Sequence, residues 1–445
     1  MGTLTQVVKR TGAVVPFNPD RITNAIYRAA IAVGGRDRAT AEGLARQVVE
    51  LLEQSNPPDH IPTVEEIQDL VEKVLIENGH ARTAKAYILY RNDRAERRRA
   101  RARAEVRTDD NVPWRKIWEV LNWAVDHDLY TVELLNDRIA RGEFGEIVRE
   151  SDRAFNEDIS TAAEMIAGRS RELRMVIIAG PSSSGKTTTT AKLAHLLSRH
   201  GLTLVPLTVD HYFYDLEMHP KDEHGDYDFE TPQALDLGLI NEHLQRLLAG
   251  EMVRIPFYDF KTGKRTLEST EMRVGRRDII LIDSLHGLYP DMTASIPVEN
   301  KFRVYIEPLL QMRDAAGAYV RWTDLRLMRR MVRDSLHRAY DPQQTLEHWH
   351  YVRASELRNI IPRVHHADYI VNSGLPYELP VMAARLGDRF GQWAVKYQGD
   401  ALRTDSLARA TRVDALLRQV TPVADESEIP PDSLMREFIG GSCYE

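Results

Sequence analysis

The chain has 445 residues, of which 43% are hydrophobic and 28% charged, a balance typical of a globular protein of two or three domains and not of a disordered or fibrous one. Its net charge of −7 argues against general nucleic-acid binding, and no apolar run is long enough to cross a membrane or direct secretion. The one cysteine, Cys443, excludes an intramolecular disulfide, so we expect a cytoplasmic protein.

The first predicted unit spans residues 1–93 and is mostly helical. The stretch from Val7 to Phe17 places two β-branched runs around a Thr-Gly turn, which predicts a small hairpin. A helix is expected to begin at Thr63, because Glu66 completes a capping box with it, and to end at Gly79.

Residues 94–170 are predicted to form an arginine-rich and helical connector. Arginine recurs from Arg91 to Arg107, which predicts an exposed helix between domains in preference to an arm that binds phosphate or nucleic acid. Residues 108–170 are either a helical connector or a helical extension of the next domain. Apolar residues at helical spacing predict an amphipathic helix, whose tryptophans we expect to pack and not to stack on a ligand: Trp114, Ile117, Trp118, Leu121 and Val125.

Residues 171–395 alternate apolar strands with helices, the pattern of an α/β fold with a parallel sheet. Five apolar runs have the length of strands: residues 175–179, 202–209, 279–282, 302–306 and 369–371. Residues 396–445 are expected to form a C-terminal tail, loose around Pro430 and Pro431.

The stretch from Gly180 to Thr187 matches the G-x-x-x-x-G-K-[ST] pattern of a phosphate-binding loop, and it lies between a predicted strand and a predicted helix. Backbone N–H groups and the helix N-terminus surround phosphate in such a loop. Lys186 is expected to reach the β- and γ-phosphates of ATP, and the Thr187 hydroxyl to ligate Mg²⁺. The residues expected to contact the nucleotide are Gly180, Ser182, Ser183, Ser184, Gly185, Lys186, Thr187 and Thr188.

Two aspartates follow apolar strands and are expected at the ligand-binding edge of the sheet. Asp210 is placed to accept the proton of an attacking hydroxyl group. Asp283 is placed to hold Mg²⁺ together with Thr187.

The segment Asp324–Asp334 places four arginines on one helical face: Arg326, Arg329, Arg330 and Arg333. We interpret this face as a lid that closes over the phosphates of ATP, in preference to a stripe neutralised by acids elsewhere in the fold. The predicted catalytic residues are Asp210, Lys186, Arg326, Arg330 and Arg333.

These motifs, in this order, resemble the uridine kinase and phosphoribulokinase family of P-loop kinases over residues 171–380. The most specific is the run from Asp210 to Tyr214, and the other matching stretches are Gly225–Glu230, Ile255–Phe260, Asp324–Asp334 and Ala367–Val371. The resemblance implies that Asp210 is the base for the acceptor hydroxyl and that Glu230 binds sugar hydroxyls. It also implies that Tyr212, Tyr258 and Phe260 bind the acceptor.

The first unit resembles an ATP-cone, the regulatory nucleotide-binding module of ribonucleotide reductases and of their transcriptional repressor. The matching stretches are Val8–Gly12, Pro16–Ile22 and Ala84–Arg91. The resemblance implies that ATP or dATP binds there, in contact with Lys9, Arg10, Arg21 and Thr63, and that the protein is a homo-oligomer.

The leading prediction is therefore an ATP- and Mg²⁺-dependent kinase of a nucleoside hydroxyl, uridine- or cytidine-like, with allosteric control by the cone. Two departures from the family pattern keep the acceptor open: Asp283-Ser284 replaces Glu-Gly, and Gly263 replaces a histidine that reads the pyrimidine. One alternative acceptor is a phosphosugar or phosphoglycerate, held by Lys261, Lys264 and Arg265. The other alternative is a nucleotide-sensing regulator without turnover. The sequence has no helix-turn-helix or zinc motif for reading DNA, so no nucleic-acid partner is expected.

Overall fold

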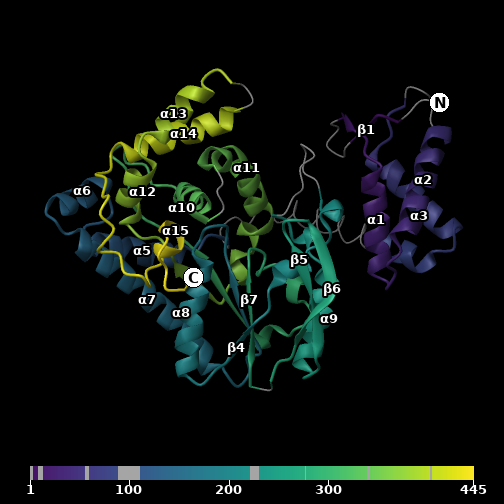
Figure 1. Ribbon diagram of the computed structural model, residues 1–445, viewed down its shortest axis with the longest axis horizontal. Helices are drawn as coiled ribbons and strands as arrows, with labels where there is room; N and C mark the ends of the chain where they lie inside the picture. Colours follow the sequence, from purple (N-terminus) through teal and green to yellow (C-terminus); the bar gives the residue numbers. More distant parts are fainter. Residues whose placement is uncertain are drawn as a thin grey trace. The chain divides into compact units, whose positions relative to one another are not determined.

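The computed structural model describes residues 4–8, 14–55, 60–88, 111–220, 230–275, 277–337, 341–400 and 403–444. The chain divides into two compact units, Met1–Thr108 and Asp109–Glu445, whose helices and strands are labelled in Figure 1. The arginine run from Arg91 to Arg107 lies outside the described residues.

The first unit is mostly helical and carries one antiparallel hairpin, as the sequence predicts. Its elements are β1 (Gln6–Val8), β2 (Val14–Pro16), α1 (Asp20–Ile31), α2 (Arg38–Ser55), α3 (Val64–Glu77) and a helical stretch at residues 81–88. The helices share a core in which Ile26, Val48 and Leu75 are almost fully buried. The predicted capping box is confirmed, because the Thr63 hydroxyl accepts from the Glu66 N–H and the Glu66 carboxylate accepts from the Thr63 N–H.

The second unit is built on a parallel sheet of five strands in the order β4-β7-β3-β8-β9. The strands are β3 (Met175–Ala179), β4 (Leu204–Pro206), β7 (Ile279–Ser284), β8 (Lys301–Glu307) and β9 (Tyr369–Asn372). Every residue of the central strand β3 is buried. The predicted α/β fold with a parallel sheet is confirmed, since all four neighbouring pairs are parallel.

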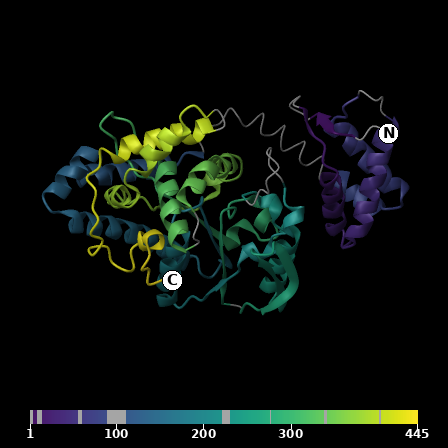
Figure 2. The same ribbon diagram turned by 45° about the horizontal axis from the view of Figure 1, so that its top comes forward.

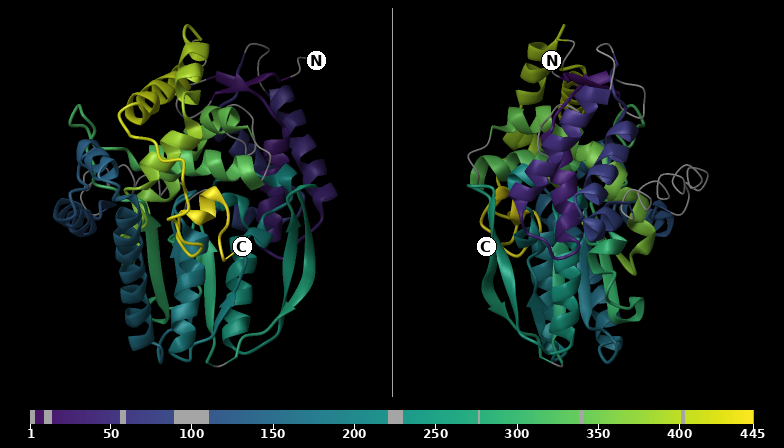
Figure 3. Two further views of the ribbon diagram at one scale, coloured as in Figure 1. Left: turned by 60° about the vertical axis from the view of Figure 1, so that its left-hand side comes forward. Right: turned by 90° about the vertical axis from the view of Figure 1, so that its right-hand side faces the viewer.

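Helices cover both faces of this sheet. The elements that pack on it include α7 (Phe144–Gly168), α8 (Lys186–Arg199), α9 (Leu237–Leu248) and the antiparallel hairpin of β5 (Val253–Asp259) and β6 (Lys264–Met272). Alternate side chains of β3 enter different cores, because successive residues of a strand point to opposite faces. Val176 and Ile178 join the core with α7 and α8, whereas Met175 and Ile177 join the core with α9. The left-hand view of Figure 3 shows the strands of the sheet side by side, with the long β5–β6 hairpin, in teal, on the right.

Eight further helices belong to the described part of the second unit. They are α5 (Trp114–Asp126), α6 (Val132–Ala140), α10 (Trp322–His337), α11 (Pro342–Asn359), α12 (Glu378–Leu386), α13 (Arg389–Tyr397), α14 (Thr404–Leu417) and α15 (Arg436–Ile439). Short 3-10 turns connect the elements, among them η2 (Val209–Tyr212) after β4. Within the described ranges, no helix combines the length and the apolar content needed to cross a bilayer.

Helix α5 belongs to the second unit, but its tryptophans do not pack as expected. Trp114 and Trp118 are 62% and 61% exposed, whereas Val120 and Ala124 on the same helix are buried. The predicted amphipathic helix is confirmed. The prediction that these two tryptophans pack in the core is wrong, because the helix packs through its smaller apolar side chains.

The C-terminal segment is also not loose. Leu434, Met435 and Phe438 are completely buried, and α15 packs against α10. Figures 1 and 2 show this segment, in yellow, returning to lie beside α8. The paired prolines at 430 and 431 indicated an irregular backbone, but the apolar side chains after them make the segment part of the core.

Candidate active site

The phosphate-binding loop connects β3 to α8, as its pattern predicts. Ser183 and Gly185 have φ angles of 58° and 93°, so the loop turns through the left-handed region twice. At Gly180 a Cβ atom would come within 2.3 Å of the Ile306 carbonyl oxygen, which leaves room only for glycine. These constraints bring the loop backbone tightly around the N-terminus of α8, where anions bind readily.

Lys186 is the first residue of α8 and lies over its own loop. Its Nζ donates to the carbonyl oxygens of Gly180 at 3.1 Å and of Pro181 at 3.3 Å. Burial lowers the pKa of Lys186, and the charge of Asp283 opposes that change. The ammonium group is thus held at the mouth of the loop, where a phosphate group would meet it.

Asp210 and Asp283 lie at the C-terminal ends of the neighbouring strands β4 and β7, next to the loop that follows β3. Desolvation raises the pKa of Asp283, and Lys186 opposes the rise. The Asp210 side chain is open to solvent, yet enough protein surrounds it for desolvation to raise its pKa too, again opposed by Lys186. The fold therefore brings the predicted base, the predicted metal ligand and the loop lysine into one electrostatic cluster.

Thr187 and Asp283 are the candidates for holding a divalent cation. Thr187 is exposed in the first turn of α8, and Asp283 accepts from the Thr190 hydroxyl at 3.4 Å. Among the described residues, no cluster of three or more His, Cys, Asp or Glu side chains forms a metal cage. This donor set fits Mg²⁺, which commonly takes one or two protein oxygens and completes its shell with substrate phosphates and water.

The four arginines of α10 separate into two pairs with different surroundings. Arg326 and Arg329 are fully buried, which the lid interpretation did not anticipate. Arg326 forms a two-point ion pair with Glu356, and Arg329 forms one with Glu378. Each also donates to the back of the phosphate-binding loop, Arg326 to the Ser182 carbonyl at 3.1 Å and Arg329 to the Ser183 carbonyl at 3.3 Å. These two guanidinium groups hydrogen-bond to the backbone of the loop. They cannot close over a nucleotide unless their ion pairs with Glu356 and Glu378 break.

Arg330 and Arg333 are only half-buried and lie on the loop side of α10. Arg330 donates to the Ser182 hydroxyl at 3.3 Å and lies 3.6 Å from a Glu230 carboxylate oxygen. Both arginines pair with Asp334. The positive charge of Arg333 contributes to the lowered pKa of Lys186, after the larger effect of burial. The lid interpretation therefore stays a prediction for Arg330 and Arg333, and the neutralised stripe describes Arg326 and Arg329.

An aromatic cluster lies next to Asp210. The ring centroid of Tyr258 is 5.5 Å from that of Phe213 and 4.9 Å from that of Phe260, and Phe213 follows η2 directly. Tyr258 is buried, whereas Phe260 is 60% exposed. Phe213 and its neighbour His219, 5.3 Å away, were missing from the sequence prediction, because their roles depend on the fold of the β5–β6 hairpin against η2.

Tyr212 and Glu230 were also predicted to meet the acceptor. Tyr212 is fully buried and its hydroxyl pairs with His243 Nδ1 at 2.9 Å, so it is a packing residue of the core beneath α9. Glu230 is fixed through its carbonyl oxygen, which accepts from Ser355, while its carboxylate faces Arg330. Residues 225–229 of the same motif lie outside the described residues.

The nucleotide contacts predicted for the first unit are partly described. Thr63 forms an isolated bridge with Val8, at the end of β1, and Arg21 is exposed near the start of α1. Lys9 and Arg10 lie outside the described residues.

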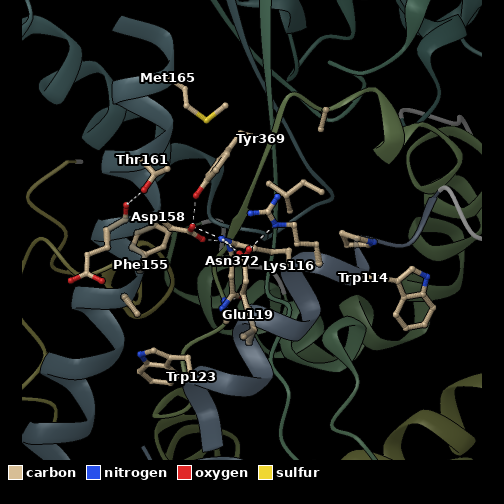
Figure 4. Close-up of a pocket in the computed structure, with 18 of the residues that line it drawn as sticks. Trp114, Lys116, Glu119, Trp123, Phe155, Asp158, Thr161, Met165, Tyr369 and Asn372 are labelled. Atoms are coloured by element: carbon tan, nitrogen blue, oxygen red, sulfur yellow. Dashed lines mark hydrogen bonds and ion pairs between the residues drawn. The ribbon is translucent and has the colours of Figure 1, made fainter. Parts of the chain in front are cut away.

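A separate cavity of about 1060 Å³ lies between α5, α7 and β9 (Figure 4). None of the predicted site residues lines it. Its central carboxylate, Asp158, pairs with Lys116 and accepts from the Tyr369 hydroxyl at 2.7 Å and from the Asn372 N–H at 2.9 Å. These contacts join α5 and α7 to the edge strand β9, so we assign Asp158 and its partners a structural role.

Comparison with known proteins agrees with this arrangement. A family model described as "Phosphoribulokinase / Uridine kinase family" matches residues 175–378, and one described as "ATP cone domain" matches residues 5–96. A uridine kinase of Chloroflexus aurantiacus is 30% identical over 214 residues, which cover 47% of this chain and 92% of that protein. The chain belongs to the phosphoribulokinase/uridine kinase family. Its kinase domain carries the phosphate-binding loop, and an ATP-cone precedes it.

Two further similarities concern the kinase domain. A uridine kinase of Deinococcus deserti is 27% identical over 212 residues, covering 47% of this chain and 93% of that protein. A solved structure described as a possible uridine kinase from Bacillus stearothermophilus is 15% identical and covers 48% of this chain and 98% of that chain, with a TM-score of 0.32.

Proposed function

We propose that the kinase domain transfers the γ-phosphoryl group of ATP, with Mg²⁺, to a hydroxyl group of a nucleoside. The observation that carries this proposal is the convergence of Lys186 and Asp283 with Asp210, beside the aromatic cluster. A carboxylate next to the γ-phosphate site can orient an attacking hydroxyl group and accept its proton. Phe260, the exposed ring of the aromatic cluster, offers a stacking surface for a planar base.

Each part of the site has a place in the transfer. The loop amides and Lys186 bind the phosphates of the donor, and Arg330 and Arg333 stabilise charge on the transferred group. Thr187 and Asp283 would hold Mg²⁺, which neutralises phosphate charge when it is bound. Asp210 takes the proton of the acceptor hydroxyl as the hydroxyl oxygen bonds to the γ-phosphorus, and the bond from that phosphorus to the β–γ bridging oxygen breaks to release ADP.

Charge around the hairpin favours a nucleoside over a phosphorylated acceptor. Lys264 is 2.7 Å from a Glu217 carboxylate oxygen, and Arg265 is 3.0 Å from an Asp236 carboxylate oxygen. Two of the three cations considered for a phosphosugar are therefore already neutralised within the domain.

The turn at Gly263 bears on how the base is recognised. Gly263 has a φ angle of 66°, and a Cβ atom there would lie 2.7 Å from the Cβ of Leu216. A histidine at this position would be strained and would clash, so the base contact that compact uridine kinases make from this turn has to come from another residue. We expect the acceptor range to differ from theirs accordingly.

A substrate panel tests the proposed reaction. Purified protein with Mg²⁺ and ATP is assayed for ADP release with ribonucleosides, deoxyribonucleosides and phosphosugars, each with and without dATP. Turnover of a nucleoside but of no phosphosugar is the expected result, whereas turnover of a phosphosugar alone would replace the proposed acceptor. No turnover with any acceptor would favour a nucleotide-sensing role. An effect of dATP on rate or on oligomeric state would support regulation through the ATP-cone.

Replacing Arg330 with alanine is expected to lower kcat by about 10²-fold, because a charged donor facing the transferred group is lost. Arg358→Ala is the matched control, since Arg358 is exposed on α11 and is assigned no part in catalysis. Steady-state kinetics of both variants provide the comparison. Equal kcat values for Arg330→Ala and the control would remove Arg330 from the catalytic machinery.

A further inference from the structure

The C-terminal segment reaches the N-terminus of α8, where the phosphate-binding loop ends. One carboxylate oxygen of Glu437 accepts from the backbone N–H of Thr188 at 2.9 Å and from the Thr188 hydroxyl at 2.8 Å. Thr188 is the third residue of α8, so its N–H is one of the donors that an α-helix leaves without an intrahelical partner. A carboxylate of the same chain thus occupies donors that a P-loop offers to phosphate.

A second side chain of the segment covers the loop itself. Leu434 lies so close to Gly185 that a Cβ atom added there would be 2.4 Å from Leu434 Cδ1. Leu434 is completely buried by this contact and by its neighbours. A nucleotide whose phosphates follow the loop into α8 would meet Leu434 and Glu437 together.

The segment is also anchored by contacts that do not involve Thr188 or Gly185. The Arg329 guanidinium lies over the Phe438 ring, 4.8 Å from its centroid. Asp432 pairs with Lys192 at 3.1 Å, and Glu426 pairs with Arg385. Displacement of Glu437 from Thr188 therefore requires a local rearrangement of the segment, because its other contacts hold it on the domain.

We propose that residues 432–439 form an autoinhibitory strap, in which Glu437 takes the place of a phosphate group of the nucleotide at the N-terminus of α8. This proposal depends on one part of the proposed function, namely that the phosphate-binding loop binds the donor nucleotide. A phosphate group and Glu437 are both anionic and compete for the same N–H and hydroxyl donors of Thr188. The apparent affinity of the loop for nucleotide is then reduced by the fraction of molecules in which the strap is closed.

Hydrogen exchange on the full chain tests the displacement directly. ADP with Mg²⁺ is the probe, and peptides report each region separately, so nucleotide bound to the ATP-cone does not interfere. Amides of residues 178–190 are expected to gain protection while amides of residues 432–439 lose it. Unchanged or increased protection of residues 432–439 on ADP binding to the loop would overturn the proposal.

Charge variants test the competition. Glu437→Ala is expected to lower the ADP concentration for half-protection of residues 178–190 about tenfold, since a closed strap held by charge-assisted hydrogen bonds is released. Glu428→Ala, which removes an equal charge from an exposed residue beside Arg149, is expected to leave that concentration unchanged. Glu437→Gln keeps a weaker acceptor for Thr188 and is expected to fall between Glu437→Ala and the wild type.

The outcomes separate the two proposals. Equal ADP affinity in the wild type and in Glu437→Ala, with residues 178–190 protected in both, would refute the strap and leave the nucleotide site intact. A loop that gains no protection in any variant would overturn the nucleotide site and, with it, the strap. Thermal unfolding of each variant confirms that the domain remains folded at the assay temperature.

Discussion

Replacing Asp210 with asparagine is expected to lower kcat for phosphoryl transfer by about 10³-fold while ADP binding to the loop is unchanged. The amide has nearly the same shape but cannot accept the proton of the acceptor hydroxyl. Asp210 belongs to η2 and not to the phosphate-binding loop, whose amides and Lys186 are expected to bind the phosphates of ADP, so the two properties should separate. Single-turnover kinetics and hydrogen exchange of residues 178–190 measure them independently.

Asp278→Asn is the matched control for this variant. Asp278 lies just before β7, at the opposite end of that strand from Asp283, and accepts from the Gly275 N–H. It should retain wild-type kcat. A kcat of Asp210→Asn within a few-fold of the control would show that the proton goes elsewhere.

The same base predicts how the rate depends on pH. Desolvation raises the pKa of Asp210 above that of an ordinary aspartate, and a base is active only when deprotonated. The kcat/KM of the wild type should therefore fall as the pH drops through this raised pKa, and the acid limb should start at a higher pH than an exposed aspartate would give. Asp210→Asn should lose that limb. A residual rate in the variant that keeps the same limb would assign it to another group.

The sheet and the loop could be predicted from the sequence because their signals are local. Parallel strands buried on both faces appear as continuous apolar runs, and β3 is such a run followed directly by the loop pattern. The end of β4 was less well predicted, since the run at 202–209 contains a strand only at Leu204–Pro206 before the chain turns into η2. An apolar run therefore predicts that a strand is present more reliably than it predicts where the strand ends.

The roles within the arginine helix could not be predicted, because each depends on a partner distant in sequence. Arg326 and Glu356 are separated by 30 residues, and Arg329 and Glu378 by 49. Helical spacing shows which arginines share a face of α10. It does not show that two of them are buried against carboxylates of other helices while the other two are partly exposed. Arg326 and Arg329 are the fully buried pair, and Arg330 and Arg333 are the partly exposed pair. The contact of Glu437 with Thr188, across 249 residues, has no local signal at all.

The ion pair of Arg326 with Glu356 gives the largest expected effect on stability. Both side chains are almost fully buried, and the positive charge of Arg326 holds the pKa of Glu356 below its usual value despite burial, which alone would raise it. Glu356→Gln removes the carboxylate that pairs with Arg326 at two points and leaves the guanidinium with Glu307, whose carboxylate oxygen lies 3.8 Å away. We expect the free energy of unfolding to fall by about 3–5 kcal/mol. Glu271→Gln, in an exposed pair with Arg254, should change it little. Urea unfolding monitored by circular dichroism compares the two.

A double variant distinguishes stability from positioning of the loop. Arg326→Met with Glu356→Leu removes both charges of the pair, so part of the lost stability should return, because a buried pair replaced by apolar side chains costs little. The return is partial because Glu307 and Arg353 lose the charges that they faced. Arg326 also donates to the Ser182 carbonyl at 3.1 Å, and that contact does not return. The double variant should therefore be more stable than Glu356→Gln and yet bind ADP more weakly than the wild type at residues 178–190. If it binds ADP as the wild type does, Arg326 stabilises the domain without shaping the loop. If Glu356→Gln unfolds at the same urea concentration as the wild type, the stability of the domain does not depend on the pairing of these two charges.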